Sequence, residues 1–175
     1  HTAIFAAGGA AYAILALVMG ALLDSRNRRV ALGEALRAFA NYLRSKAAVF
    51  DSADTHKAAL RALIEVNGVL AENLQIARDM IYAGTMTSRR LLYANALTTL
   101  VDCFEQILSS DADIEILRRS RHRHLLRRMQ SLTADFAHDI ESLVLALAAR
   151  RTDIPAPNHR AQLRAMADEI TRLAQ

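Results

Sequence analysis

The sequence predicts an all-α protein, with one transmembrane helix followed by an elongated antiparallel helical bundle. Of the 175 residues, 53% are hydrophobic but only 5% are aromatic, and the abundant Ala, Leu, Arg and Glu all favour helix. The two prolines, Pro155 and Pro157, lie close together near the C-terminal end, so helix breakers are rare elsewhere. A long uncharged run from Thr2 to Leu23 predicts the membrane helix.

Residues 1–24 are expected to form this transmembrane helix. The 22 residues of Thr2–Leu23 carry no formal charge, and a helix of about 20 residues spans the hydrocarbon core of a bilayer, about 30 Å. The run is apolar around nearly its whole circumference, so it requires burial on all sides. Since the chain starts at His1 with the run already under way, we expect it to end a membrane bundle that lies upstream. The alternative is the central helix of a soluble bundle.

Three arginines, Arg26, Arg28 and Arg29, follow the run directly. Positively charged residues mark the cytoplasmic ends of membrane helices. We therefore expect these arginines to anchor the membrane boundary, and residues 25–175 to form a cytoplasmic helical bundle domain. The formal net charge of +4 is well short of a domain dedicated to nucleic acid, which makes nucleic acid an unlikely partner.

Apolar residues at helical spacing predict helices at about 26–50, 55–83, 88–108, 114–149 and 158–174. The first is placed to continue the membrane helix. Gly84 is expected to end the second, and Thr87 or Ser88 to cap the third. Short links predict that neighbouring helices pack antiparallel. The buried stripe expected for the second helix includes Leu60 and Ile64; that expected for the third is Leu91, Leu92, Leu97, Leu100, Phe104 and Leu108.

The single cysteine, Cys103, falls within the apolar stretch Leu100–Phe104. We expect it to be a small buried apolar side chain, because no neighbour in the sequence would activate it as a nucleophile or redox group.

The densest charge cluster is Arg118–Arg128, with six arginines and two histidines in 11 residues. One interpretation is a solvated helix face stabilised by the preceding Asp111, Asp113 and Glu115. The functional hypothesis is that the cluster binds anionic lipid headgroups or steers an anionic substrate. The candidate residues for this role are Arg118, Arg119, Arg121, His122, Arg123, Arg127 and Arg128.

No sequence pattern typical of catalysis, of a cofactor or of a metal site stands out. Asp135 and His138 have the i, i+3 spacing found in di-iron bundles, but such a site needs two of these motifs and two further carboxylates. We therefore predict no enzyme activity, no cofactor and no metal.

Three segments carry a family resemblance: "YLRSKAAVFD" at Tyr42–Asp51, "ALRALIEVNGVLAENLQIARD" at Ala59–Asp79 and "VDCFEQILSSDADIEILRRS" at Val101–Ser120. In this order, after a membrane helix and a basic turn, the chain resembles the fusaric-acid-resistance and aromatic-acid-exporter family, in its YccS-like inner-membrane branch. The resemblance implies the cytoplasmic domain of a homo-oligomeric efflux carrier for aromatic carboxylic acids in the bacterial inner membrane.

The leading hypothesis is therefore a cytoplasmic domain, with its adjoining membrane helix, that serves assembly or gating of an efflux transporter. Its expected partners are the membrane, further copies of the protein and a small anionic aromatic substrate. Two alternatives remain: a soluble helical interaction scaffold, and a basic adaptor that binds an anionic membrane surface through Arg118–Arg128.

Overall fold

The computed structural model describes residues 2–51, 56–109, 123–151 and 159–173, with the backbone alone for residues 2–25. These residues form helices α1 (Thr2–Asp51), α2 (His56–Tyr82), α3 (Ser88–Ser109), α5 (Arg123–Ala149) and α6 (Arg160–Leu173). The described residues include no strand. The predicted all-α class is confirmed, and α2, α3 and α6 begin and end close to the bounds that the sequence predicts. Helix α1 covers both the uncharged run and the helix predicted at about 26–50, and for the stretch predicted from 114 only the part from Arg123 is described.

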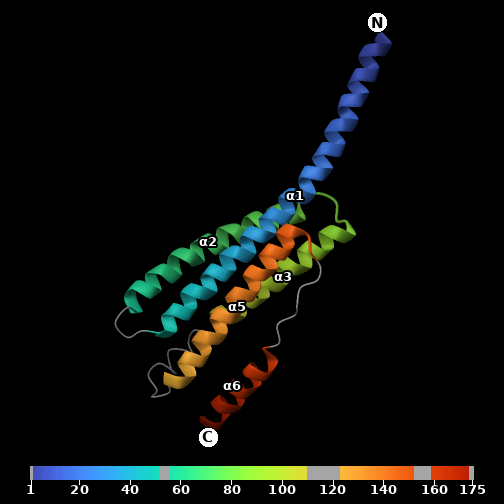
Figure 1. Cartoon of the computed structure of the whole chain (residues 1–175). Coiled ribbons are helices and arrows are strands. Elements are labelled where there is room, and N and C mark those ends of the chain that lie inside the picture. The colour runs from blue at the N-terminus through green and yellow to red at the C-terminus, as the bar shows by residue number, and fades with distance from the viewer. Residues whose placement is uncertain (1, 52–55, 110–122, 152–158, 174–175) are drawn as a thin grey trace.

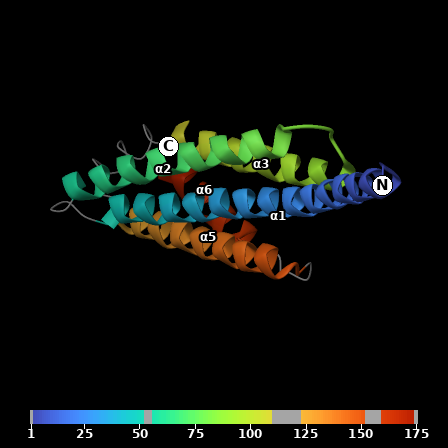
Figure 2. The same ribbon diagram turned by 90° about the horizontal axis from the view of Figure 1, so that it is seen from above.

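Helix α1 is the central element of the bundle. It packs along α5 on one side and along α2 on the other, while α3 contacts α2 and α1, and α6 contacts α5. Figure 2 shows α2 and α3 on one side of α1 and α5 on the opposite side. The chain runs alternately down and up through α1, α2, α3 and α5 (Figure 1), which is the predicted antiparallel arrangement of sequential helices.

Helix α1 continues without a break from the uncharged run into the bundle, and its N-terminal part projects beyond the other helices (Figure 1). The side chains of residues 2–25 lie outside those that the structure describes. Within the part of the chain that the structure describes, no helix has the length and apolar character needed to cross a membrane. The division into a membrane helix at residues 1–24 and a domain at residues 25–175 stays a prediction.

Small and aromatic side chains of α1 form the middle of the core. Phe39 and Tyr42 of α1 both meet Phe104 of α3 edge to face, with ring centroids 6.5 and 5.2 Å apart. Such geometry adds about 0.5–1.5 kcal/mol per pair beyond area burial. The buried alanines of α1 let neighbouring helices approach closely; they are Ala31, Ala35, Ala38, Ala40 and Ala47.

Lys46 is buried beside this aromatic cluster, with 4% of its surface exposed. Its Nζ donates a hydrogen bond of 2.8 Å to the carbonyl of Ile107, in the last turn of α3, and lies 5.8 Å from the ring centre of Tyr42. A cation is favourable at the negative end of a helix dipole. Lys46 therefore fixes the C-terminal end of α3 against α1.

The turn between α2 and α3 follows the sequence prediction. Gly84 has φ of +84°, a conformation that glycine adopts without strain at the end of a helix. The hydroxyl of Thr87 accepts a hydrogen bond of 3.3 Å from the amide of Arg90, so Thr87 is the N-cap of α3. The side chain of Arg90 is 3% exposed and donates to the carbonyls of Ala83 and Thr85.

Several predictions about buried faces are wrong. Leu91 and Leu92 are exposed, Leu92 to 69%, and Leu108 is 40% exposed. At 100° per residue, the face that contains Leu97 and Leu100 continues back through Ala94 and Arg90, and these two are the buried residues. In α2, Leu60 and Ile64 are also exposed.

Cys103 is exposed, which contradicts the predicted buried position. It lies about 100° around α3 from the middle of the face that packs on α1 and α2. Burial was predicted because Leu100, Val101 and Phe104 surround Cys103 in the sequence, but the sequence neighbours do not determine which side of α3 it faces.

Replacing Arg90 by Met is expected to lower the free energy of unfolding by about 2 kcal/mol, because charge-assisted hydrogen bonds to the Ala83 and Thr85 carbonyls are lost. Arg89→Met is the matched control: Arg89 is exposed, so its replacement should change stability by less than about 0.5 kcal/mol. Urea unfolding followed by circular dichroism measures both. Equal effects of the two substitutions would contradict the role assigned to Arg90.

Candidate functional site

Part of the basic cluster that the sequence singles out lies where α6 packs against α5. His159, just before α6, places Nε2 2.6 Å from Oδ2 of Asp139 on α5. At the other end of α6, the two carboxylate oxygens of Glu169 contact Nε2 of His124 at 2.6 Å and Nη1 of Arg128 at 2.5 Å. Because residue numbers rise along α6 as they fall along α5, the two helices are antiparallel. Two clusters of polar contacts therefore hold α6 at its ends.

These contacts shift two pKa values. The hydrogen bond with Asp139, and then that with Gln162, raises the pKa of His159 above its ordinary value near 6.5. The hydrogen bond with His124 lowers the pKa of Glu169 below its ordinary value near 4.5, and the charge of Arg128 acts in the same direction. Both shifts favour the charged forms that pair across the α5–α6 junction.

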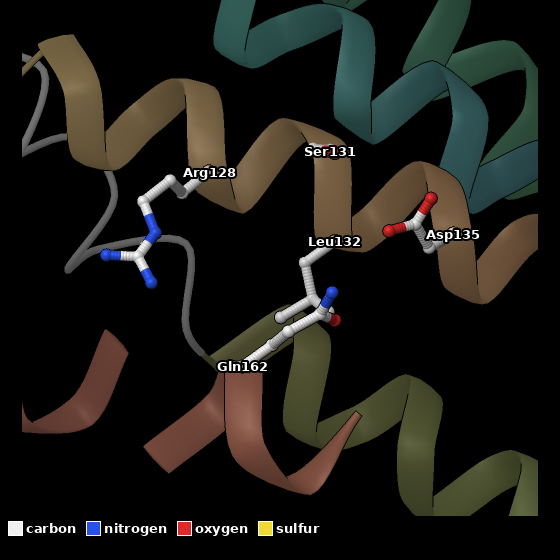
Figure 3. A pocket seen from close by; sticks show the side chains of 5 residues that line it. All are labelled: Arg128, Ser131, Leu132, Asp135 and Gln162. Atoms are coloured by element: carbon white, nitrogen blue, oxygen red, sulfur yellow. The ribbon is translucent and has the colours of Figure 1, made fainter. Parts of the chain in front are cut away.

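An open pocket of about 230 Å³ lies between the two clusters. Figure 3 shows Arg128, Ser131, Leu132 and Asp135 on α5 and Gln162 reaching from α6. None of the described residues that line the pocket is aromatic. Arg128 is already paired with Glu169, and the carboxylate of Asp135 would repel an anion. This lining suits the packing of α6 better than the binding of an aromatic carboxylate.

The structure describes only the last residues of the predicted basic cluster. Arg118, Arg119, Arg121 and His122 lie outside the described residues, as do Asp111, Asp113 and Glu115. Arg123 is the first residue of α5, with its side chain outside the described set. Arg127 is exposed, and Arg128 pairs with Glu169. The proposed role in steering or headgroup binding is untested for all seven.

The predicted membrane anchors lie at the opposite end of the bundle. Arg26 is exposed, and Arg28 and Arg29 are half-buried. The Nε of Arg28 donates to the carbonyl of Met80 at 3.2 Å. Burial, followed by the nearby charge of Arg90, lowers the pKa of Arg28. Arg28 of α1 therefore lies beside the C-terminal end of α2 and the N-terminal end of α3.

The histidine–carboxylate pair that the sequence singled out is not the one that forms. Asp135 and His138 are both exposed, whereas Asp139 binds His159, 20 residues away. Within the described ranges, no group of three His, Cys, Asp or Glu residues could hold a metal ion. The pair Asp139–His159 has no local spacing by which the sequence could reveal it; only its position opposite α6 brings it together.

Comparison with protein-family models identifies a family. The family model for FUSC-like inner membrane protein yccS matches residues 1–175, the whole chain. No curated protein and no solved structure matches. The match confirms the family resemblance of the sequence, and the family is related to membrane transport.

The attachment of α6 is expected to weaken as the pH rises through the raised pKa of His159. The raised pKa of His159 stabilises the folded state fully below the ordinary histidine pKa near 6.5, and this stabilisation is lost as the pH rises above the pKa in the folded protein. The lowered pKa of Glu169 stabilises the folded state at pH values above its ordinary pKa near 4.5. Protection of the α6 amides from hydrogen exchange, corrected for intrinsic rates, should therefore be higher at pH 5.5 than at pH 9. His159→Gln should reduce this difference, and a difference as large in the variant as in the unchanged protein would disprove the assignment, because the contact of His124 with Glu169 remains in both.

Proposed function

The chain belongs to the family of FUSC-like inner membrane proteins, and from that premise we propose that it is the cytoplasmic domain, with its adjoining membrane helix, of an efflux transporter for aromatic carboxylic acids. The bundle serves assembly or gating of the transporter, and the transported acid binds in the membrane part. The substrate class and the self-association of the transporter rest on the family resemblance.

The continuity of α1 is the observation that carries the proposal. One helix includes both the uncharged run and the central element of the bundle, and an unbroken α-helix transmits tilt and rotation along its axis. Its buried residues Ala35, Phe39 and Tyr42 belong to the core that the neighbouring helices share. A movement of the membrane segment would therefore act directly on the centre of the bundle, which suits a gating or assembly element.

The contents of the bundle also support this role. The described pocket at the α5–α6 junction lacks an aromatic wall, and its arginine is paired with Glu169. The three arginines after the run support placing residues 25–175 on the cytoplasmic side. The bundle is thus better suited to transmit movement of the membrane segment or to organise assembly of the transporter than to bind the transported acid.

Asn27→Pro in the full-length transporter tests the coupling. Asn27 is exposed and lies in α1 just after the uncharged run, so proline there removes one backbone hydrogen bond and kinks the helix at a cost of about 3 kcal/mol. Export of a radiolabelled aromatic carboxylate such as benzoate should fall to the level of cells without the transporter. Circular dichroism of the purified variant should show that the bundle keeps its helix content.

Two controls accompany this experiment. Asn27→Ala preserves the helix and should preserve export. Ala161→Pro places proline in the first turn of α6, where helices tolerate it, and should also preserve export. Normal export by Asn27→Pro at normal expression, or unchanged export and oligomeric state after deletion of residues 25–175, would contradict the proposed role.

A further inference from the structure

One end of the bundle carries exposed apolar side chains from α1, α2, α3 and the turn between α2 and α3, next to the uncharged part of α1. We name this end the collar and define it as residues 26–30, 79–92 and 148–151. Its exposed large apolar residues are Val30, Met80, Tyr82, Met86, Leu91 and Leu92. Exposed apolar side chains gathered at one end of a bundle mark a contact surface more often than single ones do.

Contacts show that the segments of the collar lie at one level along α1. Arg28 donates a hydrogen bond to the carbonyl of Met80 on α2, and the charge of Arg90 on α3 lies near enough to lower the pKa of Arg28. On the other side, Cδ2 of Leu147 lies 3.9 Å from the position of a Cβ on Gly33. Since α5 runs antiparallel to α1, Arg150 and Arg151 then lie about level with residues 29 and 30.

The collar also concentrates the positive charge of the chain. It contains seven arginines and one acidic residue, Asp79, a net charge of +6, whereas the whole chain has +4; the remainder is therefore negative by two charges. Arg26, Arg89, Arg150 and Arg151 are exposed. Arginines beside exposed Tyr and Leu side chains are typical of surfaces that rest on an anionic bilayer.

The turn at the tip of the collar is held in place. Arg90 binds the carbonyls of Ala83 and Thr85 from within, and Thr87 caps α3. This arrangement presents Met86, 49% exposed, on a fixed turn. An anchored apolar side chain enters a membrane interface at a lower entropic cost than one on a mobile loop.

We propose that the collar rests on the anionic phospholipid headgroups of the membrane that the N-terminal part of α1 enters, with Met86, Leu91 and Leu92 inserted between the headgroups and the arginines on their phosphates. This inference rests on the membrane placement of Thr2–Leu23 in the proposed function. A second copy of the collar is a poor partner, because two surfaces of charge +6 repel each other.

The collar also differs in position from the Arg118–Arg128 cluster. Leu126 packs against Phe50, which lies 24 residues, or about 36 Å, along α1 from Arg26. A separation of this size exceeds the Debye length at physiological salt, about 8 Å. Headgroup binding is therefore better assigned to the collar than to Arg127 and Arg128 when α1 enters the membrane.

Fluorophore depth in vesicles tests the proposal. The full chain is reconstituted into phosphatidylcholine vesicles with a minority of phosphatidylglycerol, and a polarity-sensitive fluorophore is attached at Met86→Cys in a Cys103→Ala background. Lipids with brominated acyl chains should quench this label. The matched control is the same label on native Cys103, which is exposed and lies roughly 15–20 Å below the collar along the bundle; it should not be quenched.

A charge variant provides the second arm. Arg89→Gln, Arg150→Gln and Arg151→Gln together should reduce quenching of the Met86 label, with the docking equilibrium falling about fivefold per arginine. The control triple Arg61→Gln, Arg127→Gln and Arg164→Gln removes the same charge from exposed positions outside the collar and should leave quenching unchanged. Vesicles of phosphatidylcholine alone should resemble the collar triple.

Three results would overturn the inference. The first is a Met86 label that is no more quenched by lipid than the Cys103 label. The second is an equal effect of the two arginine triples. The third is a label shielded from both brominated lipid and aqueous iodide, which would show that protein covers the turn. Flotation separates this failure from that of the proposed function: a chain that does not float with vesicles fails both, whereas a chain that floats without quenching at Met86 fails only this inference.

Discussion

Burial of α1 on two opposite sides is the constraint on which the rest of the bundle depends. Helices α2 and α5 both pack along it. Its side chains therefore have to fill two interfaces and still be small enough to let both helices approach closely. Alanines meet this requirement where helices come together, and the aromatic residues Phe39 and Tyr42 fill the wider space toward α3. Helix α3 contacts α2 and α1, and α6 contacts α5; both are therefore placed by partners that α1 positions.

Local chemistry made much of the fold predictable. Helix periodicity predicted the helices, Gly84 predicted the end of α2, and Thr87 or Ser88 predicted the start of α3, because each of these depends on residues near one another in the sequence. The buried face of α3 was not predictable from apolarity alone. Arg90 and Ala94 are buried, whereas Leu91 and Leu92 are exposed. The partner helices determine which face of α3 is buried, and Arg90 can be buried because its guanidinium binds backbone carbonyls.

The candidate site was predictable only in part. The sequence identified a charged region around Arg128, but the partner of Arg128 is Glu169, 41 residues further on, and Asp139 finds His159 rather than His138. Such pairs depend on how α6 lies against α5, which no spacing within one helix encodes. Cys103 shows the same limit: the apolar residues around it predicted burial, but its orientation on α3 exposes it.

The pairing of α1 with α5 affects folding during synthesis, because the two helices are far apart in the sequence. Phe50 ends up against Leu126, yet 76 residues separate them, and at about 5–20 residues per second the second partner is made roughly 4–15 s after the first. During that interval α2 can cover one side of α1 while the other side stays open to water or to chaperones. If translation stopped before Leu147, part of the apolar face of α1 that packs on α5 would stay exposed to water. Such a fragment would be a target for quality-control proteases.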